Sequence, residues 1–125
     1  MRLFGLLFYI EKNNIKDIDL QKEFEFIENI LGKDRFVKLK EDNEIIKDNL
    51  LIEAEVLYEK NKNINNELNE LKLNFEEDYT KQDFMKAMGE LSKAERGKDE
   101  IRIDEIGKKI QALTVRLNEL SKRRK

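Results

Sequence analysis

The most restrictive feature of this sequence is the absence of proline, together with only five glycines in 125 residues. Sheet proteins need such residues where strands end, because tight turns require their backbone angles. Their scarcity favours long helices. Charged residues make up 42% of the chain, but the apolar residues are regularly spaced, so we expect an ordered all-α fold rather than a disordered chain.

Several kinds of catalytic chemistry are excluded by composition. The chain has no cysteine and no histidine, so it can form neither disulfides, histidine bases nor Cys/His zinc sites. No phosphate-binding glycine motif occurs, and Ser92 and Ser121 lack an obvious base. Asp17 and Asp19 are better explained as helix caps than as Mg²⁺ ligands. We therefore expect no enzyme activity, cofactor or metal in these residues.

The apolar residues between Leu3 and Lys12 predict a first helix that is apolar on nearly every side. Such a helix must be enclosed by others. The run is short for a signal peptide and far below the ~20 residues of a membrane span. We expect a buried helix that ends at Asn13 and Asn14, and no membrane insertion.

Three further helices are expected before residue 61. The first runs from Leu20 to Leu31, is capped by Asp17 or Asp19, and is followed by Gly32 in a left-handed conformation. A short helix covers residues 34–40. Asn43 is then expected to cap a helix with one apolar face, formed by Ile46, Leu50, Ala54 and Leu57. Asn61 and Lys62 weaken this pattern.

A long connecting helix is predicted from Ile64 to Glu95, about 48 Å if unbroken. Thr80 and Asp83 resemble a capping box, so the sequence leaves open a kink or break near Tyr79. We place residues 1–78 in a small helical bundle that includes the start of this helix. Residues 79–125 are expected to form an antiparallel helical hairpin.

The hairpin turn is expected at Arg96–Asp99, where Gly97 can adopt a positive φ and Asp99 can cap the last helix. Phe84, Met88 and Leu91 are expected to line the first helix, with Met88 opposite Ile106. Gly89 and Gly107 indicate either a close approach of the helices or tolerated surface glycines. The apolar seam of the last helix has heptad spacing and comprises Ile103, Ile106, Ile110, Leu113, Leu117 and Leu120.

Two helices alone cannot cover such a seam. We expect partial exposure of Met85, Leu113, Val115, Leu117 and Leu120, which either pack on the chain's own long helix or bind a partner. Basic residues are concentrated beyond Ile106, where Glu119 is the one acidic residue: Lys108, Lys109, Arg116, Lys122, Arg123, Arg124 and Lys125. They complement the helix dipole or recognise an acidic protein surface. A net charge of −2 gives no overall attraction to nucleic acid.

The stretch FMKAMGELSKAERGKDEIRIDEIGKKIQALTVRLNELSKRRK, residues 84–125, resembles the extreme C-terminus of bacterial replicative DNA primases. In that family a helix ending in an Ala-Glu-rich segment turns at a glycine into a final leucine-bearing helix with a basic tail. The matching positions are Ala94, Glu95, Gly97, Ile106, Ile110, Leu113, Leu117 and Leu120. The preceding residues resemble the family's small helical bundle in size and helix pattern alone.

The resemblance implies a cytoplasmic docking domain that binds the N-terminal domain of the hexameric replicative helicase and lacks the catalytic domains of its parent primase, a DNA-directed RNA polymerase. The hairpin would make the main contact and the bundle would modulate the helicase. The expected partner-binding residues are Met85, Leu113, Arg116, Leu117, Leu120, Lys122 and Arg123. The alternatives are a self-associating coiled-coil scaffold and a small nucleic-acid-binding regulator.

Overall fold

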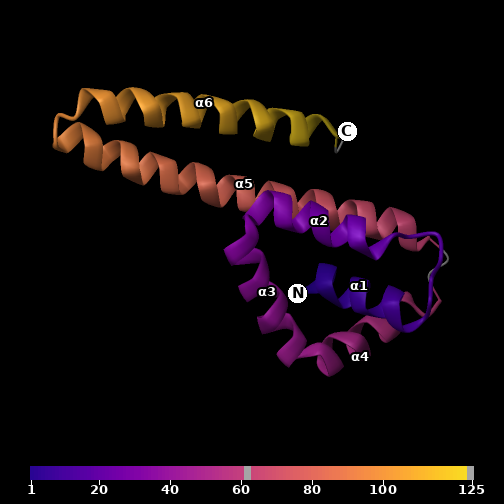
Figure 1. The fold of residues 1–125 in the computed structure, drawn as a ribbon. Helices are drawn as coiled ribbons and strands as arrows, with labels where there is room; N and C mark the ends of the chain where they lie inside the picture. Colours follow the sequence, from indigo (N-terminus) through magenta and orange to yellow (C-terminus); the bar gives the residue numbers. More distant parts are fainter. Residues whose placement is uncertain (61–62, 124–125) are drawn as a thin grey trace. The chain divides into compact units, whose positions relative to one another are not determined.

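A computed structural model describes residues 1–60 and 63–123. This part of the chain contains helices and no strand (Figure 1), which confirms the all-α fold class. Asn61, Lys62, Arg124 and Lys125 lie outside the described residues. The helices are α1 (Arg2–Lys12), α2 (Leu20–Leu31), α3 (Lys33–Ile45), α4 (Lys47–Tyr58), α5 (Ile64–Arg96) and α6 (Glu100–Arg123).

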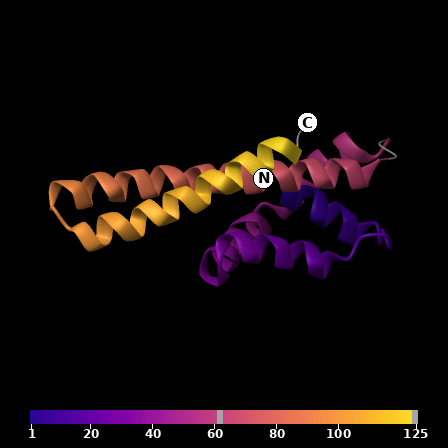
Figure 2. The ribbon, with the colours of Figure 1, turned by 90° about the horizontal axis from the view of Figure 1, so that it is seen from above.

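The contacts divide the chain into two compact units, Met1–Lys72 (unit 1) and Leu73–Lys125 (unit 2). Helix α5 therefore contributes its first turns to unit 1 and the rest to unit 2. The sequence placed this boundary between residues 78 and 79, a few residues later. Figures 1 and 2 both show α6 returning alongside α5 from the turn that joins them, so unit 2 is an antiparallel hairpin.

Helix α1 forms the core of unit 1, and it packs chiefly against α4 and also against α2. Its apolar side chains are enclosed, and Phe4, Leu6 and Leu7 have no exposed surface. The ring of Phe4 lies 6.1 Å from that of Phe24, a usual aromatic contact distance. The helix ends at Asn13 and Asn14 as expected, since Asn14 adopts a left-handed φ of 50°. The expectation of a buried first helix is confirmed.

Helix α2 begins and ends where the sequence predicted. The Asp19 carboxylate accepts hydrogen bonds from the backbone N–H groups of Gln21 and Lys22, which identifies Asp19 as the cap. At the other end, Gly32 has φ 82° and ψ 162°, a combination essentially restricted to glycine. Gly32 thus lets the chain turn directly from α2 into α3.

The prediction for Asn43 is wrong. Helix α3 extends to Ile45, well past residue 40, and contains Asn43 as a buried residue. Its side-chain amide donates to the Leu39 carbonyl oxygen at 2.7 Å, so it is used inside one helix rather than at the start of the next. Helix α4 follows without a side-chain cap, at Ile46.

Of the expected apolar face of α4, Leu50 and Ala54 are buried, whereas Ile46 and Leu57 are 42% and 43% exposed. Tyr58 is buried instead of Leu57. The middle of the expected face therefore packs in unit 1, while at the end of the helix Tyr58 takes the place expected for Leu57.

Helix α5 is continuous, so there is no break near Tyr79. Thr80 is buried within the helix, and its hydroxyl donates to the Glu76 carbonyl oxygen at 2.6 Å. A threonine that bonds back in this way is satisfied in the middle of a helix. The resemblance to a capping box therefore did not mark a helix start.

The turn between α5 and α6 lies at the predicted place but uses a different residue. Lys98, not Gly97, adopts the left-handed conformation, with φ 55°. The N–H of Lys98 bonds to the Glu95 oxygen and the N–H of Asp99 to the Ala94 oxygen, which is the pattern of a Schellman motif with Lys98 at its left-handed position. The carboxylate of Asp99 then caps α6 by accepting from the Arg102 N–H at 3.2 Å, as expected.

Candidate functional site

The hairpin of unit 2 is held together by small side chains on α5. Ala87 and Ala94 are buried together with Ile106, and four larger apolar residues pack around them: Leu91, Ile103, Ile110 and Leu113. The heptad seam predicted for α6 is confirmed at these positions. The prediction for Met88 is wrong, because Met88 is 42% exposed and alanines occupy the helix face toward the seam. Alanine lets two helices approach closely, so the interface leaves little room for a methionine.

The glycines of the hairpin do not create this close approach. A Cβ atom added at Gly89 or Gly107 would meet nothing within 4 Å. The interpretation of both as tolerated surface glycines is therefore the correct one.

The expected apolar anchors differ widely in exposure. Met85 is 69% exposed and Val115 58%, while Leu113 and Leu117 are partly buried. Leu120 has no exposed surface, so the expectation of partial exposure is wrong at this position. Leu120 is therefore not available to a partner in this structure.

The expected charge partners also divide into two groups. Arg116 forms an ion pair with Glu76 across the hairpin and a second with Glu119 at 3.2 Å. The Glu76 side chain is only 9% exposed, against 37% for Arg116. Arg116 is therefore occupied in joining α6 to α5 and in neutralising a buried carboxylate.

Lys122 and Arg123 are exposed, and they form no ion pair within residues 1–60 and 63–123. They lie in the last turn of α6, where a positive charge also complements the helix dipole. Of the basic residues predicted to meet a partner, these two remain available in the described structure.

The sequence did not identify the role of Glu76. It lies in the acidic run Glu76–Asp78, which is typical of a solvated helix face. The predicted register, which sets Met88 opposite Ile106, places Glu76 near the level of Arg116, and this register was the signal that could have revealed the pair. On the same part of α5, the rings of Phe75 and Tyr79, which are one helical turn apart in the sequence, are in contact, with 4.6 Å between their centres.

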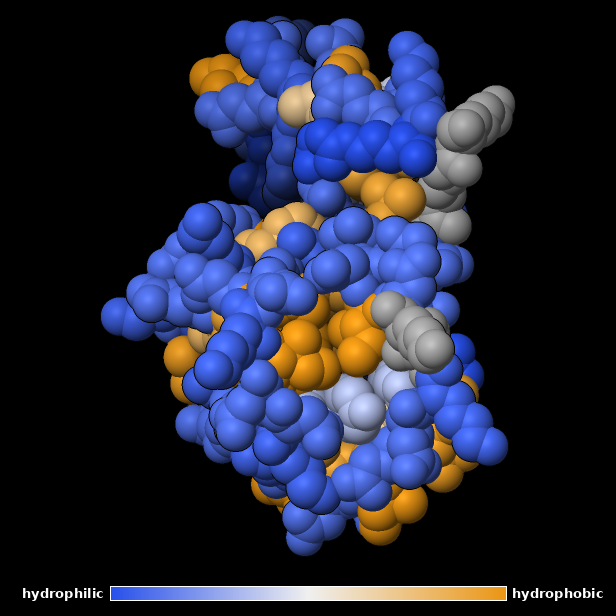
Figure 3. All heavy atoms as spheres, turned by 90° about the vertical axis from the view of Figure 1, so that its right-hand side faces the viewer, coloured by the Kyte–Doolittle hydropathy of each residue, from blue (hydrophilic) through white to orange (hydrophobic). Residues whose placement is uncertain are grey.

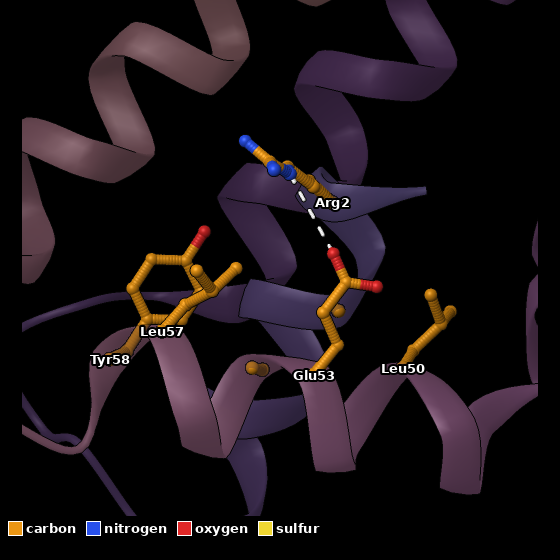
Figure 4. A pocket seen from close by; sticks show the side chains of 7 residues that line it. Arg2, Leu50, Glu53, Leu57 and Tyr58 are labelled. Atoms are coloured by element: carbon orange, nitrogen blue, oxygen red, sulfur yellow. Dashed lines mark ion pairs between the residues drawn. The ribbon is translucent and has the colours of Figure 1, made fainter.

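Unit 1 contains a shallow pocket between α1 and α4 (Figure 4). An ion pair between Arg2 and Glu53, with atoms 3.7 Å apart, crosses one side of it, and Tyr58 lies at the other. Burial, and next the negative charge of Glu67, raise the pKa of the Tyr58 phenol above its ordinary value. The pocket holds about one water molecule, which is too little for a small-molecule substrate.

Among the described residues, no group of acidic side chains is arranged to hold a metal ion. None of the described helices is both long and apolar enough to cross a membrane. No protein-family model, curated protein or solved structure matches this chain.

Proposed function

We propose that this chain is the non-catalytic helicase-binding domain of a bacterial DNA primase. In this proposal unit 2 binds the N-terminal domain of the hexameric replicative helicase in the cytoplasm and so couples primer synthesis to DNA unwinding. The resemblance of residues 84–125 to that primase region supplies the identity of the partner. The hairpin form of unit 2, with its turn at Gly97–Lys98, is consistent with the resemblance.

The observation that supports the docking role is the exposure of apolar side chains on the hairpin. Met85, Ile101 and Val115 are 69%, 75% and 58% exposed. A single exposed apolar side chain is ordinary, but three of them lie on a two-helix hairpin whose core includes the short side chains of Ala87 and Ala94. A small hairpin with exposed apolar side chains of this size is suited to a partner that covers them.

The contribution of each expected residue follows from its surroundings. Met85 is the most accessible anchor, and its flexible side chain adapts to varied surfaces. Leu113 and Leu117 offer only part of their surface, and Leu120 is fully enclosed and offers none. Lys122 and Arg123 are placed to attract an acidic surface, which mainly accelerates association.

Titration of the chain with the N-terminal domain of a replicative helicase from the same genome tests this proposal. Met85→Gln is expected to weaken binding about tenfold, because exposed anchors that become buried dominate interface energies. Lys122→Glu with Arg123→Glu is expected to lower the association rate and its dependence on salt. Arg116 is unsuitable for this test, since its loss also disturbs the hairpin.

A matched control is Val37→Gln with Ile45→Gln in unit 1, two exposed residues of α3 that are expected to leave helicase binding unchanged. Absence of binding by the unaltered chain would reject the helicase as partner. Analytical ultracentrifugation then tests the first alternative function: a tight dimer that Met85→Gln dissociates supports the self-associating scaffold. Strongly salt-dependent DNA binding supports the nucleic-acid-binding regulator.

A further inference from the structure

Helix α4 of unit 1 carries exposed apolar side chains that the hairpin proposal does not use. Ile52 and Val56 are 62% and 79% exposed and lie four residues apart, so they are neighbours on one side of the helix. Figure 3 shows apolar side chains, in orange, also emerging elsewhere in unit 1, at the height of α1 and α4 in Figure 1. β-branched side chains in water on a helix gain nothing from packing and slightly lower helix propensity, so their presence needs another reason.

Acidic residues surround this apolar pair. Asp48 precedes Ile52 by one turn and Glu59 follows Val56 by about one turn; both are exposed and form no ion pair within residues 1–60 and 63–123. We call Asp48, Ile52, Val56 and Glu59 the α4 face. The wider segment from residue 41 to 59 contains a single base, Lys47, beside the acidic residues Glu41, Asp42, Glu44, Asp48, Glu53, Glu55 and Glu59.

The basic residues near the α4 face do not neutralise it. Lys47 is directed to α1, where its ammonium lies 3.7 Å from Glu11 and 5.1 Å from the centre of the Phe8 ring. Lys12 pairs with Glu55 at 2.7 Å, and a hydrogen bond with that carboxylate, its charge and then the charge of Asp48 raise the pKa of Lys12. Lys60 is next to Glu59 in the sequence, just after the end of α4, and forms no ion pair within residues 1–60 and 63–123. Asp48 is close enough to Lys12 to feel its charge, but neither Asp48 nor Glu59 forms an ion pair within residues 1–60 and 63–123, so both carboxylates can still pair with a binding partner.

The charge of the α4 face decides which occupant it fits. Two copies that associated symmetrically through this face would bring the same acidic residues together, and like charges across an interface are unfavourable. An anionic membrane or a nucleic acid would be repelled in the same way. A helix with an apolar stripe flanked by lysine or arginine fits this face. Its apolar stripe can cover Ile52 and Val56, and its basic residues can pair with Asp48 and Glu59, as charged residues do beside the apolar seam of coiled coils.

We infer that the α4 face of unit 1 docks a basic amphipathic helix of a partner protein. This docking site is separate from the hairpin surface and does not depend on the identity of the hairpin's partner. Ile52 and Val56 are its apolar anchors, and Asp48 and Glu59 select a basic helix over an acidic one.

The probe for this inference is a fluorescent three-heptad peptide with leucine at the a and d positions and lysine elsewhere. Its charge-reversed form, with glutamate in place of lysine, tests selectivity. Fluorescence anisotropy with the full 125-residue chain is expected to show binding of the lysine peptide and at least about tenfold weaker binding of the glutamate peptide. Ile52→Gln with Val56→Gln is expected to weaken the lysine peptide about tenfold or more, and Asp48→Lys with Glu59→Lys to weaken it several-fold.

The matched control is Met85→Gln with Ile101→Gln, which changes two equally exposed apolar residues of unit 2 and is expected to leave peptide binding unchanged. Circular dichroism establishes that each variant is folded. The inference is overturned if the lysine peptide does not bind, if the two α4 substitutions leave its affinity unchanged, or if both peptides bind equally. Self-association that Ile52→Gln with Val56→Gln abolishes would also overturn it, since the occupant would then be a second copy.

Discussion

The two units of this chain are stabilised in different ways. In unit 1, a helix that is apolar on nearly all sides is enclosed, and large side chains such as Phe4, Leu6 and Leu7 have no exposed surface. In unit 2, the core between the helices depends on Ala87, Ala94 and Ile106, with an ion pair between Arg116 and Glu76 at the other end of the hairpin. Both units leave apolar side chains exposed, but unit 1 encloses aromatic rings and leucines around one helix, whereas the contact between the helices of unit 2 includes two alanines.

This difference indicates which residues of each unit are needed for folding and which can take part in binding. Close packing makes every large residue of α1 essential to unit 1. The hairpin is held by short side chains and a charge pair, so its exposed methionine and valine are not needed for folding. Because unit 2 consists of two helices, much of each helix is exposed and available for binding.

The largest effect is expected from a cavity in unit 1. Phe4→Ala removes a fully enclosed ring that contacts Phe8 and Phe24, and it is expected to lower the free energy of unfolding by about 3–5 kcal/mol. The matched change in unit 2, Ile110→Ala, affects a half-buried residue and is expected to cost less, about 1–2 kcal/mol. Urea denaturation followed by circular dichroism measures both. Equal losses would remove the contrast between the units.

The next largest effect concerns the charge pair of unit 2. Arg116→Ala leaves the nearly buried Glu76 carboxylate without a counter-charge and is expected to destabilise the chain by about 3 kcal/mol. Glu76→Gln is expected to cost less, because Arg116 is 37% exposed and can turn to water while it keeps its contact with Glu119.

Glu119→Gln is the control for this prediction, since the Glu119 side chain is 53% exposed and a surface pair contributes less than about 1 kcal/mol. Hydrogen exchange of the amides in α6 locates the loss in unit 2. If Arg116→Ala were no more harmful than Glu119→Gln, the hairpin would be held by its apolar seam alone.

Periodicity and capping predicted most of this architecture from the sequence. The spacing of Ile103, Ile106 and Ile110 identified the inner side of α6, and the aspartates Asp19 and Asp99 marked two helix starts. These signals are local, because a helix start is decided by a few backbone N–H groups and one side chain. The all-apolar first helix likewise predicted its own burial.

The errors arose where a residue had two possible uses. Asn43 and Thr80 can cap a helix or bond to the preceding turn inside one, and only tertiary packing decides between these. The sequence placed Met88 in the seam beside Phe84 and Leu91, but Ala87 is the residue buried there, because the separation of two helices depends on their smallest facing residues. Leu120 and Arg116 belong to the hairpin itself, and their sequence positions near the chain end did not reveal this.

A smaller effect is expected at the turn of unit 1. Gly32→Ala places a Cβ at φ 82° and ψ 162°, and a strained conformation of this kind costs about 1–3 kcal/mol. A Cβ there meets nothing within 4 Å, so the cost arises from the backbone alone. The midpoint of urea denaturation is expected to fall without a change in helix content. An unchanged midpoint would contradict the conformation described at this turn.

The smallest effect is expected at the corresponding turn of unit 2, and it has the opposite sign. Lys98 occupies a left-handed position with φ 55°, where a side chain costs roughly 1 kcal/mol or more relative to glycine. Lys98→Gly is therefore expected to stabilise the chain by about 1 kcal/mol, less the greater flexibility of glycine in the unfolded state.

The control at this turn is Gly97→Ala, whose new Cβ would lie 3.5 Å from the Lys93 carbonyl oxygen, an ordinary contact. It is expected to change stability by less than about 1 kcal/mol. Urea denaturation of the two variants compares them directly. Loss of stability on Gly97→Ala together with no gain on Lys98→Gly would show that the glycine carries the positive φ, and the two units would then build their turns alike.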